Sequence, residues 1–315
     1  MMEAIQQRVQ VPVSYQGFRL DQAAAKLFPG FSRSRLQTWI KTAALRVNSS
    51  VAKPRDKLLG GEWLTLEVVL EVQGEWQAED IALDIVFEDE EILVLNKSAN
   101  IVVHPAAGNY SGTVLNALLH RIPELNTVPR AGIVHRLDKD TTGLMVVAKT
   151  LTAHTHLVSQ LQARSVSREY EAVVQGVMTA GGTVNALIGR HPRQRKKMAV
   201  LSSGGKDAVT HYRVLQRFSD HTHIRVKLET GRTHQIRVHM SHSGYPLVGD
   251  RVYAGRCKIP KGNNHELIDM LRKFPRQALH AARLGLIHPA SQQFMEWSVS
   301  LPEDMLELLH ILKES

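Results

Sequence analysis

The residues with the clearest chemical potential lie in segment 132–149, GIVHRLDKDTTGLMVVAK. An apolar approach ends at Asp138, a polar turn runs from Lys139 to Gly143, and a strand-like run follows. Such a turn presents Asp138 at a domain surface, where its carboxylate could act as a nucleophile, as a base or as a stabiliser of positive charge. The same spacing also fits an aspartate whose carboxylate caps the turn. Local spacing leaves both interpretations open.

Histidines are the other candidates for chemistry, since the chain has 16 of them. His234, His239 and His242 crowd one stretch that is expected to be helical, but positions 234 and 239 would point about 140° apart on an ideal helix. Neither His-Glu-x-x-His nor Cys-x-x-Cys occurs, and Cys257 is the single cysteine. We found no glycine-rich phosphate loop either. The sequence therefore predicts neither a metal site nor a bound cofactor.

Charge is distributed unevenly along the chain. Lys and Arg outnumber Asp and Glu by 39 to 30, and a pI near 9.7 indicates a polyanionic partner. Segment 76–100 holds seven acids and one lysine, whereas segment 190–213 holds seven basic residues and one acid. The basic segment could contact RNA phosphates, although a solvated run of charge is the alternative. Its candidate RNA-binding residues are His191, Arg193, Arg195, Lys196 and Lys197.

The N-terminal segment predicts a short helical hairpin. Apolar residues recur at helical spacing up to Leu27, Phe28-Pro29-Gly30 ends that helix, and Ser32 stands where a second N-cap is expected. The second helix combines an apolar face with basic residues, and strand-like alternation follows it. A merely solvated helix face is the alternative to RNA binding. The candidate RNA-binding residues here are Arg33, Arg35, Lys41 and Arg46.

Periodicity predicts an α+β protein of two domains. Residues 1–72 form a small α+β domain with its core at about 17–68, residues 73–80 form a linker, and residues 81–315 form the catalytic domain. Strands cluster in runs instead of alternating regularly with helices, which favours a mixed, largely antiparallel central sheet flanked by helices. We find neither a signal segment nor an apolar run of 18 residues, so we expect a cytoplasmic protein without a membrane partner.

Three blocks of sequence resemble one enzyme family. HRLDKDTTG resembles the central motif H-R-L-D-x-x-T-[ST]-G of the RluA/RluD family of pseudouridine synthases. SREYEAVVQG resembles the second motif of that family, and LETGRTHQIRVHMSHSGYPLVGD the third. Residues 19–68 resemble the S4 RNA-binding module, with Gly61-Glu62 in place of the usual Gly-Asp. The resemblance covers nearly the whole chain and is closest to the RluD branch.

This resemblance implies a function. Members of the family isomerise uridine to pseudouridine in RNA without a cofactor or metal, and the RluD branch acts on the helix 69 loop of 23S ribosomal RNA. The expected partner is therefore large-subunit ribosomal RNA or a pre-ribosomal particle. The resemblance implies that Asp138 is the essential catalytic residue, that Tyr170 lies against the target base and that Arg136 fills the space vacated by the flipped base. It also implies that Ile236 packs in the site and that Arg237 is the ionic partner of Asp138.

Other functions remain open from sequence. A synthase of the same family could act on another ribosomal RNA or transfer RNA site, and a non-catalytic ribosome assembly factor could use the same scaffold. A metal-dependent RNA hydrolase would need ligand clusters that the sequence lacks. The joint presence of Asp138, Tyr170 and Arg237 in their motifs favours the synthase.

Overall fold

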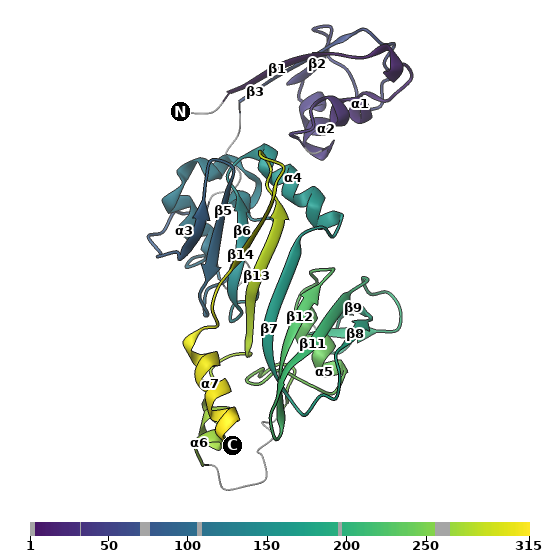
Figure 1. Cartoon of the computed structure of the whole chain (residues 1–315). Coiled ribbons are helices and arrows are strands. Elements are labelled where there is room, and N and C mark those ends of the chain that lie inside the picture. Colours follow the sequence, from purple (N-terminus) through teal and green to yellow (C-terminus); the bar gives the residue numbers. More distant parts are fainter. Residues whose placement is uncertain (1–3, 32, 70–75, 106–108, 195–196, 256–264) are drawn as a thin grey trace.

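A computed structural model describes residues 4–31, 33–69, 76–105, 109–194, 197–255 and 265–315 (Figure 1). The N-terminal unit holds a three-stranded antiparallel sheet in the order β1-β3-β2, together with two helices. Its elements are β1 (Ala4–Gln10), α1 (Leu20–Leu27), α2 (Arg33–Lys41), β2 (Leu45–Val47) and β3 (Trp63–Val69). The predicted helical hairpin is confirmed, while Ser32 lies outside the described residues. Strand β1, which the sequence did not predict, pairs with β3 and adds residues 4–10 to this sheet.

The buried carboxylate of Asp21 ties the two N-terminal helices together. It is fully buried on α1 and accepts hydrogen bonds from Arg33 Nη2 at 2.7 Å, Gln37 Nε2 at 2.6 Å and Arg19 Nε. Leu36 and Ile40 of α2 are fully buried in the hydrophobic cluster. Arg33, a candidate RNA-binding residue, therefore also holds the unit together.

The larger unit is built on a nine-stranded sheet, in the order β4-β5-β6-β13-β7-β12-β11-β8, with β14 paired to β13. Among the described strands, β6 and β13 pair in parallel and the remaining pairs are antiparallel. The predicted α+β class with a mixed, largely antiparallel sheet is thus confirmed. The strands are β4 (Ile85–Glu88), β5 (Ile92–Lys97), β6 (Thr142–Ala148), β7 (Ser167–Gln175), β8 (Gly182–Asn185), β11 (Val209–Arg217), β12 (His221–Leu228), β13 (Leu279–Ile287) and β14 (Phe294–Ser298).

Both faces of the central strands are buried. Along β5, Leu93 and Leu95 join one hydrophobic cluster, whereas Ile92 and Val94 join another on the opposite face, as the two-residue period of a strand requires. Helices α3 (Val114–Arg121) and α5 (Gln235–His242) contribute to the first cluster, and α4 (Leu151–Gln162) contributes to the second. Two short 3-10 helices, η2 (Pro123–Thr127) and η3 (Pro129–Gly132), lie between α3 and β6, and another, η1 (Val13–Tyr15), lies between β1 and α1 of the N-terminal unit.

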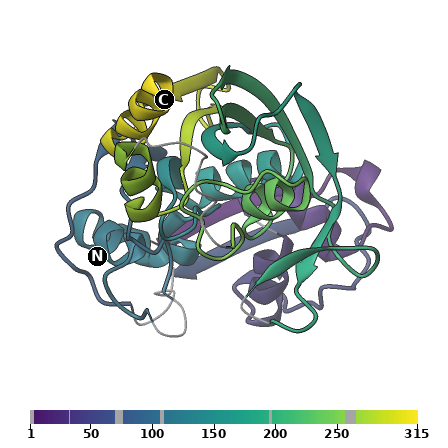
Figure 2. The same ribbon diagram turned by 90° about the horizontal axis from the view of Figure 1, so that it is seen from below.

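Two helices and a small hairpin complete the larger unit. Helices α6 (His265–Lys273) and α7 (Glu303–Glu314) pack against each other at the end of the sheet that lies away from the N-terminal unit (Figures 1 and 2). Strands β9 (Leu187–Arg190) and β10 (Met198–Leu201) form a separate two-stranded hairpin beside α5. The sequence reading did not predict α6, β8, β9, β10 or β13.

The N-terminal unit touches the larger unit at α4. Thr155 Oγ1 of α4 donates a hydrogen bond to Gly30 O at 3.1 Å. Residues 76–80 of the predicted linker lack regular structure, yet Asn116 Nδ2 of α3 donates to Gln77 O. None of the helices in the described ranges is long and apolar enough to span a bilayer.

Candidate active site

The turn that carries Asp138 is fixed from three directions. Thr141 N donates to Asp138 O at 3.1 Å and closes the turn. The ammonium of Lys97, at the end of β5, donates to Lys139 O at 2.8 Å, and Arg276 Nη1 donates to Asp140 O at 3.3 Å. The backbone of the turn is thus held by buried cations, and the Asp138 carboxylate is left for other partners. The turn-capping interpretation of Asp138 is therefore wrong.

A glycine brings this turn close to β13. Gly143, in the second position of β6, has φ of +110°, and a Cβ added there would lie 2.3 Å from Ala281 O. Only glycine fits such a conformation and such a close approach. Next to it, the Thr142 hydroxyl lies 2.8 Å from His280 Nδ1. The polar turn of the central motif therefore lies in direct contact with strand β13 at the centre of the sheet.

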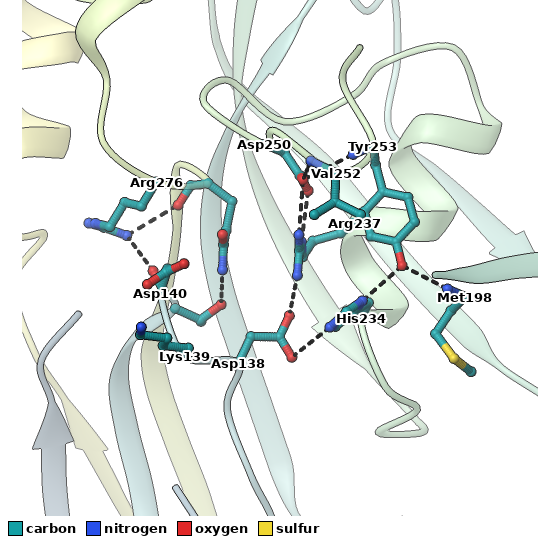
Figure 3. Close-up of polar contacts among 12 residues, drawn as sticks. Asp138, Lys139, Asp140, Met198, His234, Arg237, Asp250, Val252, Tyr253 and Arg276 are labelled. Atoms are coloured by element: carbon teal, nitrogen blue, oxygen red, sulfur yellow. Dashed lines mark hydrogen bonds and ion pairs between the residues drawn. The ribbon is translucent and has the colours of Figure 1, made fainter. Parts of the chain in front are cut away.

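Asp138 pairs with Arg237, as the resemblance implied. Arg237 Nη1 of α5 donates to Asp138 Oδ2 at 2.9 Å, and the two residues are 99 positions apart in sequence. The rest of the guanidinium binds Asp250, through Nε at 2.7 Å and Nη2 at 2.9 Å (Figure 3). Asp250 is held in turn by the backbone amides of Val252 and Tyr253. One buried arginine therefore bridges two carboxylates, of which Asp138 faces the cavity.

The charge state of Arg237 follows from these neighbours. Burial opposes the cationic form, but hydrogen bonds and attraction from Asp250, followed by those from Asp138, outweigh it and raise the pKa of Arg237 above its usual value. Its side chain is 7% exposed and that of Asp250 is fully buried. The arginine is thus a permanent cation, and its hydrogen bond to Oδ2 fixes the direction of the Asp138 carboxylate.

His234 faces the second oxygen of Asp138. Its Nε2 lies 3.8 Å from Oδ1, and its Nδ1 lies 2.8 Å from the hydroxyl of Tyr253 (Figure 3). The same hydroxyl accepts a hydrogen bond from Met198 N at 2.9 Å. Burial lowers the pKa of His234, so its imidazole is neutral at neutral pH.

A cavity of about 760 Å³ opens in front of Asp138. Two of the described residues that line it carry carboxylates, Asp138 and Glu229, and six are arginines. A cavity of this size and charge suits an anionic ligand such as a nucleotide. The six arginines are Arg130, Arg136, Arg164, Arg168, Arg232 and Arg237.

The structure places the other predicted catalytic residues around the same cavity. Tyr170 on β7 lines it while remaining 7% exposed, and burial raises the pKa of its phenol, which is neutral at neutral pH. Ile236 is 4% exposed and packs beneath the cavity, whereas Arg136 is exposed at its edge. His135 accepts a hydrogen bond from Val146 N, and burial lowers its pKa to about 3, with the positive charge of Arg168 as the second cause.

Those predicted RNA-binding residues that the structure describes lie outside this cavity, in two places. On the N-terminal unit, Lys41 and Arg46 are exposed, and Arg35 lies 5.6 Å from the ring centroid of Trp39. In the loop between β9 and β10, Arg193 is exposed, and His191 Nδ1 accepts hydrogen bonds from the backbone amides of residues 193 and 194. The loop also contains Lys197, while Arg195 and Lys196 fall outside the described residues. RNA binding by these residues stays a prediction.

Sequence reasoning missed several residues of the site. Asp250 stands at the end of the third motif, and its only signal was that position. Tyr253, Lys97 and Arg276 carried no signal, because their partners are far away in sequence. His234 lies in the histidine-rich stretch for which the sequence predicts no metal site, and the structure turns it toward Asp138.

His239, another histidine of this region, has structural partners. His239 Nδ1 lies 2.9 Å from Thr210 Oγ1, and its Nε2 lies 3.2 Å from Ala186 O. Over the described ranges, no three His, Cys, Asp or Glu side chains gather closely enough to hold a metal ion.

Comparison with known proteins places these motifs in a family. Residues 91–242 match the family described as RNA pseudouridylate synthase. The chain is 63% identical over 314 residues to the ribosomal large subunit pseudouridine synthase D of Pseudomonas aeruginosa, covering 100% of this chain and 98% of that protein. It is 55% identical to the protein of the same name from Escherichia coli K12, with 99% and 96% covered.

Solved structures agree with the fold. The chain is similar to human RNA pseudouridylate synthase domain containing 4, with a TM-score of 0.56 and 26% identity over 73% of this chain and 93% of that one. Human RNA pseudouridylate synthase domain containing 1 has a TM-score of 0.54 at 24% identity, covering 76% and 98%, and supports the fold alone.

Proposed function

This chain is a member of the RNA pseudouridylate synthase family, and we propose that it isomerises uridine to pseudouridine in large-subunit ribosomal RNA. The single observation that carries the proposal is the buried Arg237, which fixes the Asp138 carboxylate at the wall of an arginine-lined cavity. The near full-length identity to synthases named for the ribosomal large subunit supports the substrate class. We further propose that the helix 69 loop of 23S RNA is the target and that the reaction takes place in the cytoplasm.

The reaction breaks the N1–C1′ bond of uridine, turns the uracil and forms a C5–C1′ bond, after which C5 loses its proton. No atom is gained or oxidised overall, so the proposed chemistry needs only groups of the protein. Asp138 would act from Oδ1, because Arg237 occupies Oδ2. Three roles fit a carboxylate there: attack on an electron-poor carbon, removal of the C2′ proton, or stabilisation of positive charge at C1′.

The target base must leave its stack to enter the cavity. Flipping costs a few kcal/mol and least in a loop, which supports a loop as substrate. Tyr170 would lie against the flipped base, and because its phenol is neutral it would act first as a packing and hydrogen-bonding surface. Arg136, exposed at the cavity edge, would fill the vacated space in the RNA. Ile236 would hold the base plane from below.

The surrounding basic residues would position the RNA. Exposed Lys41 and Arg46 of the N-terminal unit and Arg193 of the β9–β10 loop would contact phosphates. Such contacts bind RNA independently of its sequence, so the choice of uridine would depend on RNA shape. We keep the S4-like role of residues 1–72 as part of the proposal.

The test is pseudouridine mapping by carbodiimide and primer extension on 23S RNA treated with the purified chain. Asp138→Asn should abolish all stops, because the amide lacks the negative charge, while RNA binding stays within about twofold. Asp269→Asn is the matched control, since Asp269 is an exposed residue of α6 that pairs with Lys273. Stops outside helix 69 would move the substrate and keep the chemistry. Undiminished stops with Asp138→Asn would refute the catalytic role, and tight binding without stops would favour an assembly factor.

A further inference from the structure

A chain of two hydrogen bonds and one longer polar contact leads from the β9–β10 hairpin to the catalytic aspartate. It runs from Met198 N to the Tyr253 hydroxyl at 2.9 Å, from that hydroxyl to His234 Nδ1 at 2.8 Å, and ends with His234 Nε2 at 3.8 Å from Asp138 Oδ1 (Figure 3). The motif resemblance and the comparisons assign a role to neither Tyr253 nor His234.

The donors in this chain can be assigned. A backbone amide only donates, so Met198 N–H uses one lone pair of the Tyr253 oxygen. The phenolic hydrogen is then available to His234 Nδ1, and when Nδ1 accepts it the ring hydrogen lies on Nε2, facing Asp138. The opposite tautomer would set the Nε2 lone pair against a carboxylate oxygen. Hydrogen bonding and electrostatics therefore select the same tautomer.

The backbone conformation of His234 is strained, and it directs the imidazole toward Asp138. His234 has φ of +56° in the left-handed region, at the N-cap of α5, and its side chain makes no capping hydrogen bond there. Non-glycine residues adopt this region at an energetic cost, and such strain concentrates at functional sites. The strained residue points its ring into the cavity that Asp138 lines.

We propose that Tyr253 is a positioning residue, whose hydroxyl fixes His234 as the Nε2–H tautomer and so keeps a donor beside the reactive oxygen of Asp138. This inference rests on the proposed synthase activity. Because the 3.8 Å separation exceeds a hydrogen bond, the donor leaves Oδ1 free in the unbound protein and is available to an oxygen of the nucleotide that enters between them. Since Met198 is the first residue of β10, the chain of contacts forms only when the β9–β10 hairpin packs beside α5.

The charged groups around His234 favour the neutral ring. Burial is the largest influence and lowers the pKa of His234; the carboxylates of Asp138 and Asp250 oppose it, and the guanidinium groups of Arg237 and Arg136 reinforce it. The hydrogen bond that Nδ1 accepts from Tyr253 stabilises the neutral form further. Removing that hydroxyl should raise the pKa of His234 and let it protonate, and a protonated ring would ion-pair with Asp138.

The first test is spectroscopic and does not depend on activity. Histidine-selective 15N NMR of the full chain should show His234 with Nε2 protonated and Nδ1 unprotonated, with His234→Asn identifying its signals. Tyr253→Phe removes only the hydroxyl and keeps the ring that lies 5.1 Å from the Arg237 guanidinium carbon. It should lose the pattern of a single Nε2–H ring, through protonation of both nitrogens or through a mixture of the two neutral tautomers. An Nδ1–H ring in the unaltered protein, or an unchanged pattern in Tyr253→Phe, would overturn the proposal.

The second test is kinetic. Under single-turnover conditions on 23S RNA, Tyr253→Phe should be about tenfold slower, the effect expected for one lost hydrogen bond, with RNA affinity changed less than about twofold. The acid limb of its pH–rate profile should move to higher pH. Tyr212→Phe on β11, outside the cavity, should match the unaltered protein. An equal rate and equal profile for Tyr253→Phe would refute the positioning role.

The two tests separate this inference from the proposed function. If the unaltered protein forms no pseudouridine in any RNA, the synthase proposal fails and the positioning role of Tyr253 in that reaction fails with it, while the NMR result still decides the tautomer. If the unaltered protein is active and Tyr253→Phe is equally active, only the inference fails.

Discussion

Replacing Asp250 by asparagine should cost both stability and activity, because Asp250 holds the arginine that holds Asp138. The fully buried carboxylate receives two hydrogen bonds from Arg237, at 2.7 and 2.9 Å. Asparagine keeps one acceptor oxygen, but it turns an amide donor toward a guanidinium N–H and removes the negative charge. Breaking a buried ion pair from one side costs about 3–5 kcal/mol. Asp138 still compensates the arginine in part, so we expect a loss of about 3 kcal/mol in the free energy of unfolding.

The activity loss follows from the same geometry. Without Asp250, the guanidinium is free to turn both of its edges toward Asp138 and to occupy Oδ1 as well as Oδ2. To react, Oδ1 would first have to break this charge-assisted hydrogen bond, which costs about 1.5–3 kcal/mol. The rate should therefore fall roughly tenfold to a hundredfold. Urea unfolding measures the stability term. Tritium release from C5-labelled 23S RNA in a single turnover measures the rate.

Glu88→Gln is the matched control for a destabilised protein. Glu88 of β4 also receives two hydrogen bonds from one arginine, Arg121, at 2.7 and 3.2 Å, and neither residue lines the cavity. It should lower the free energy of unfolding by about 1 kcal/mol, less than Asp250→Asn because Glu88 is 24% exposed and Arg121 is 49% exposed. Its rate at a temperature where it is folded should stay within a few-fold of normal. A normal rate for Asp250→Asn, or equal rate losses in both variants, would refute the reasoning.

Two further predictions concern buried charge elsewhere. Burial lowers the pKa of Lys97 to about 8, although the attraction of Asp140 and Asp138 opposes this shift. Between pH 8 and 10.5 the unfolded chain therefore binds more protons at Lys97 than the folded chain does. The free energy of unfolding should then increase as the pH rises through this window. Urea unfolding at pH 8 and at pH 10.5 should show this increase in the unaltered protein and no such increase in Lys97→Met. Parallel pH profiles for the two proteins would contradict the prediction. Asp21→Asn should destabilise the N-terminal unit by about 2 kcal/mol, because Arg33 and Arg19 lose their buried partner. Hydrogen exchange should then accelerate in α1 and α2 while β6 is unaffected, and unchanged exchange in α1 would exclude the buried contact as a stabilising one.

Local patterns in the sequence were sufficient for many elements. The short apolar run of β5, the alternation along β12 and the helical spacing of α1, α4 and α7 are set within a few residues, because each element has its own pattern and its own stop signals. The turn around Asp138 was predicted for the same reason. By contrast, β13 was missed. Both of its faces are buried, so LHAARLGLI shows no alternation, and its pairing with β6 joins residues about 138 positions apart.

The residues of the site also divide into those that local sequence patterns identify and those that only the fold brings together. The sequence by itself determined that Asp138 stands on a polar turn, and the motifs supplied Tyr170 and Arg237 through resemblance to a family. Only the tertiary structure decided that Arg237 is shared between Asp138 and Asp250, and that His234 is turned toward Asp138 by Tyr253 and Met198. The physical reason is that these contacts need strands and helices from distant parts of the chain to pack first. A local pattern carries no information about which buried charge will meet which partner.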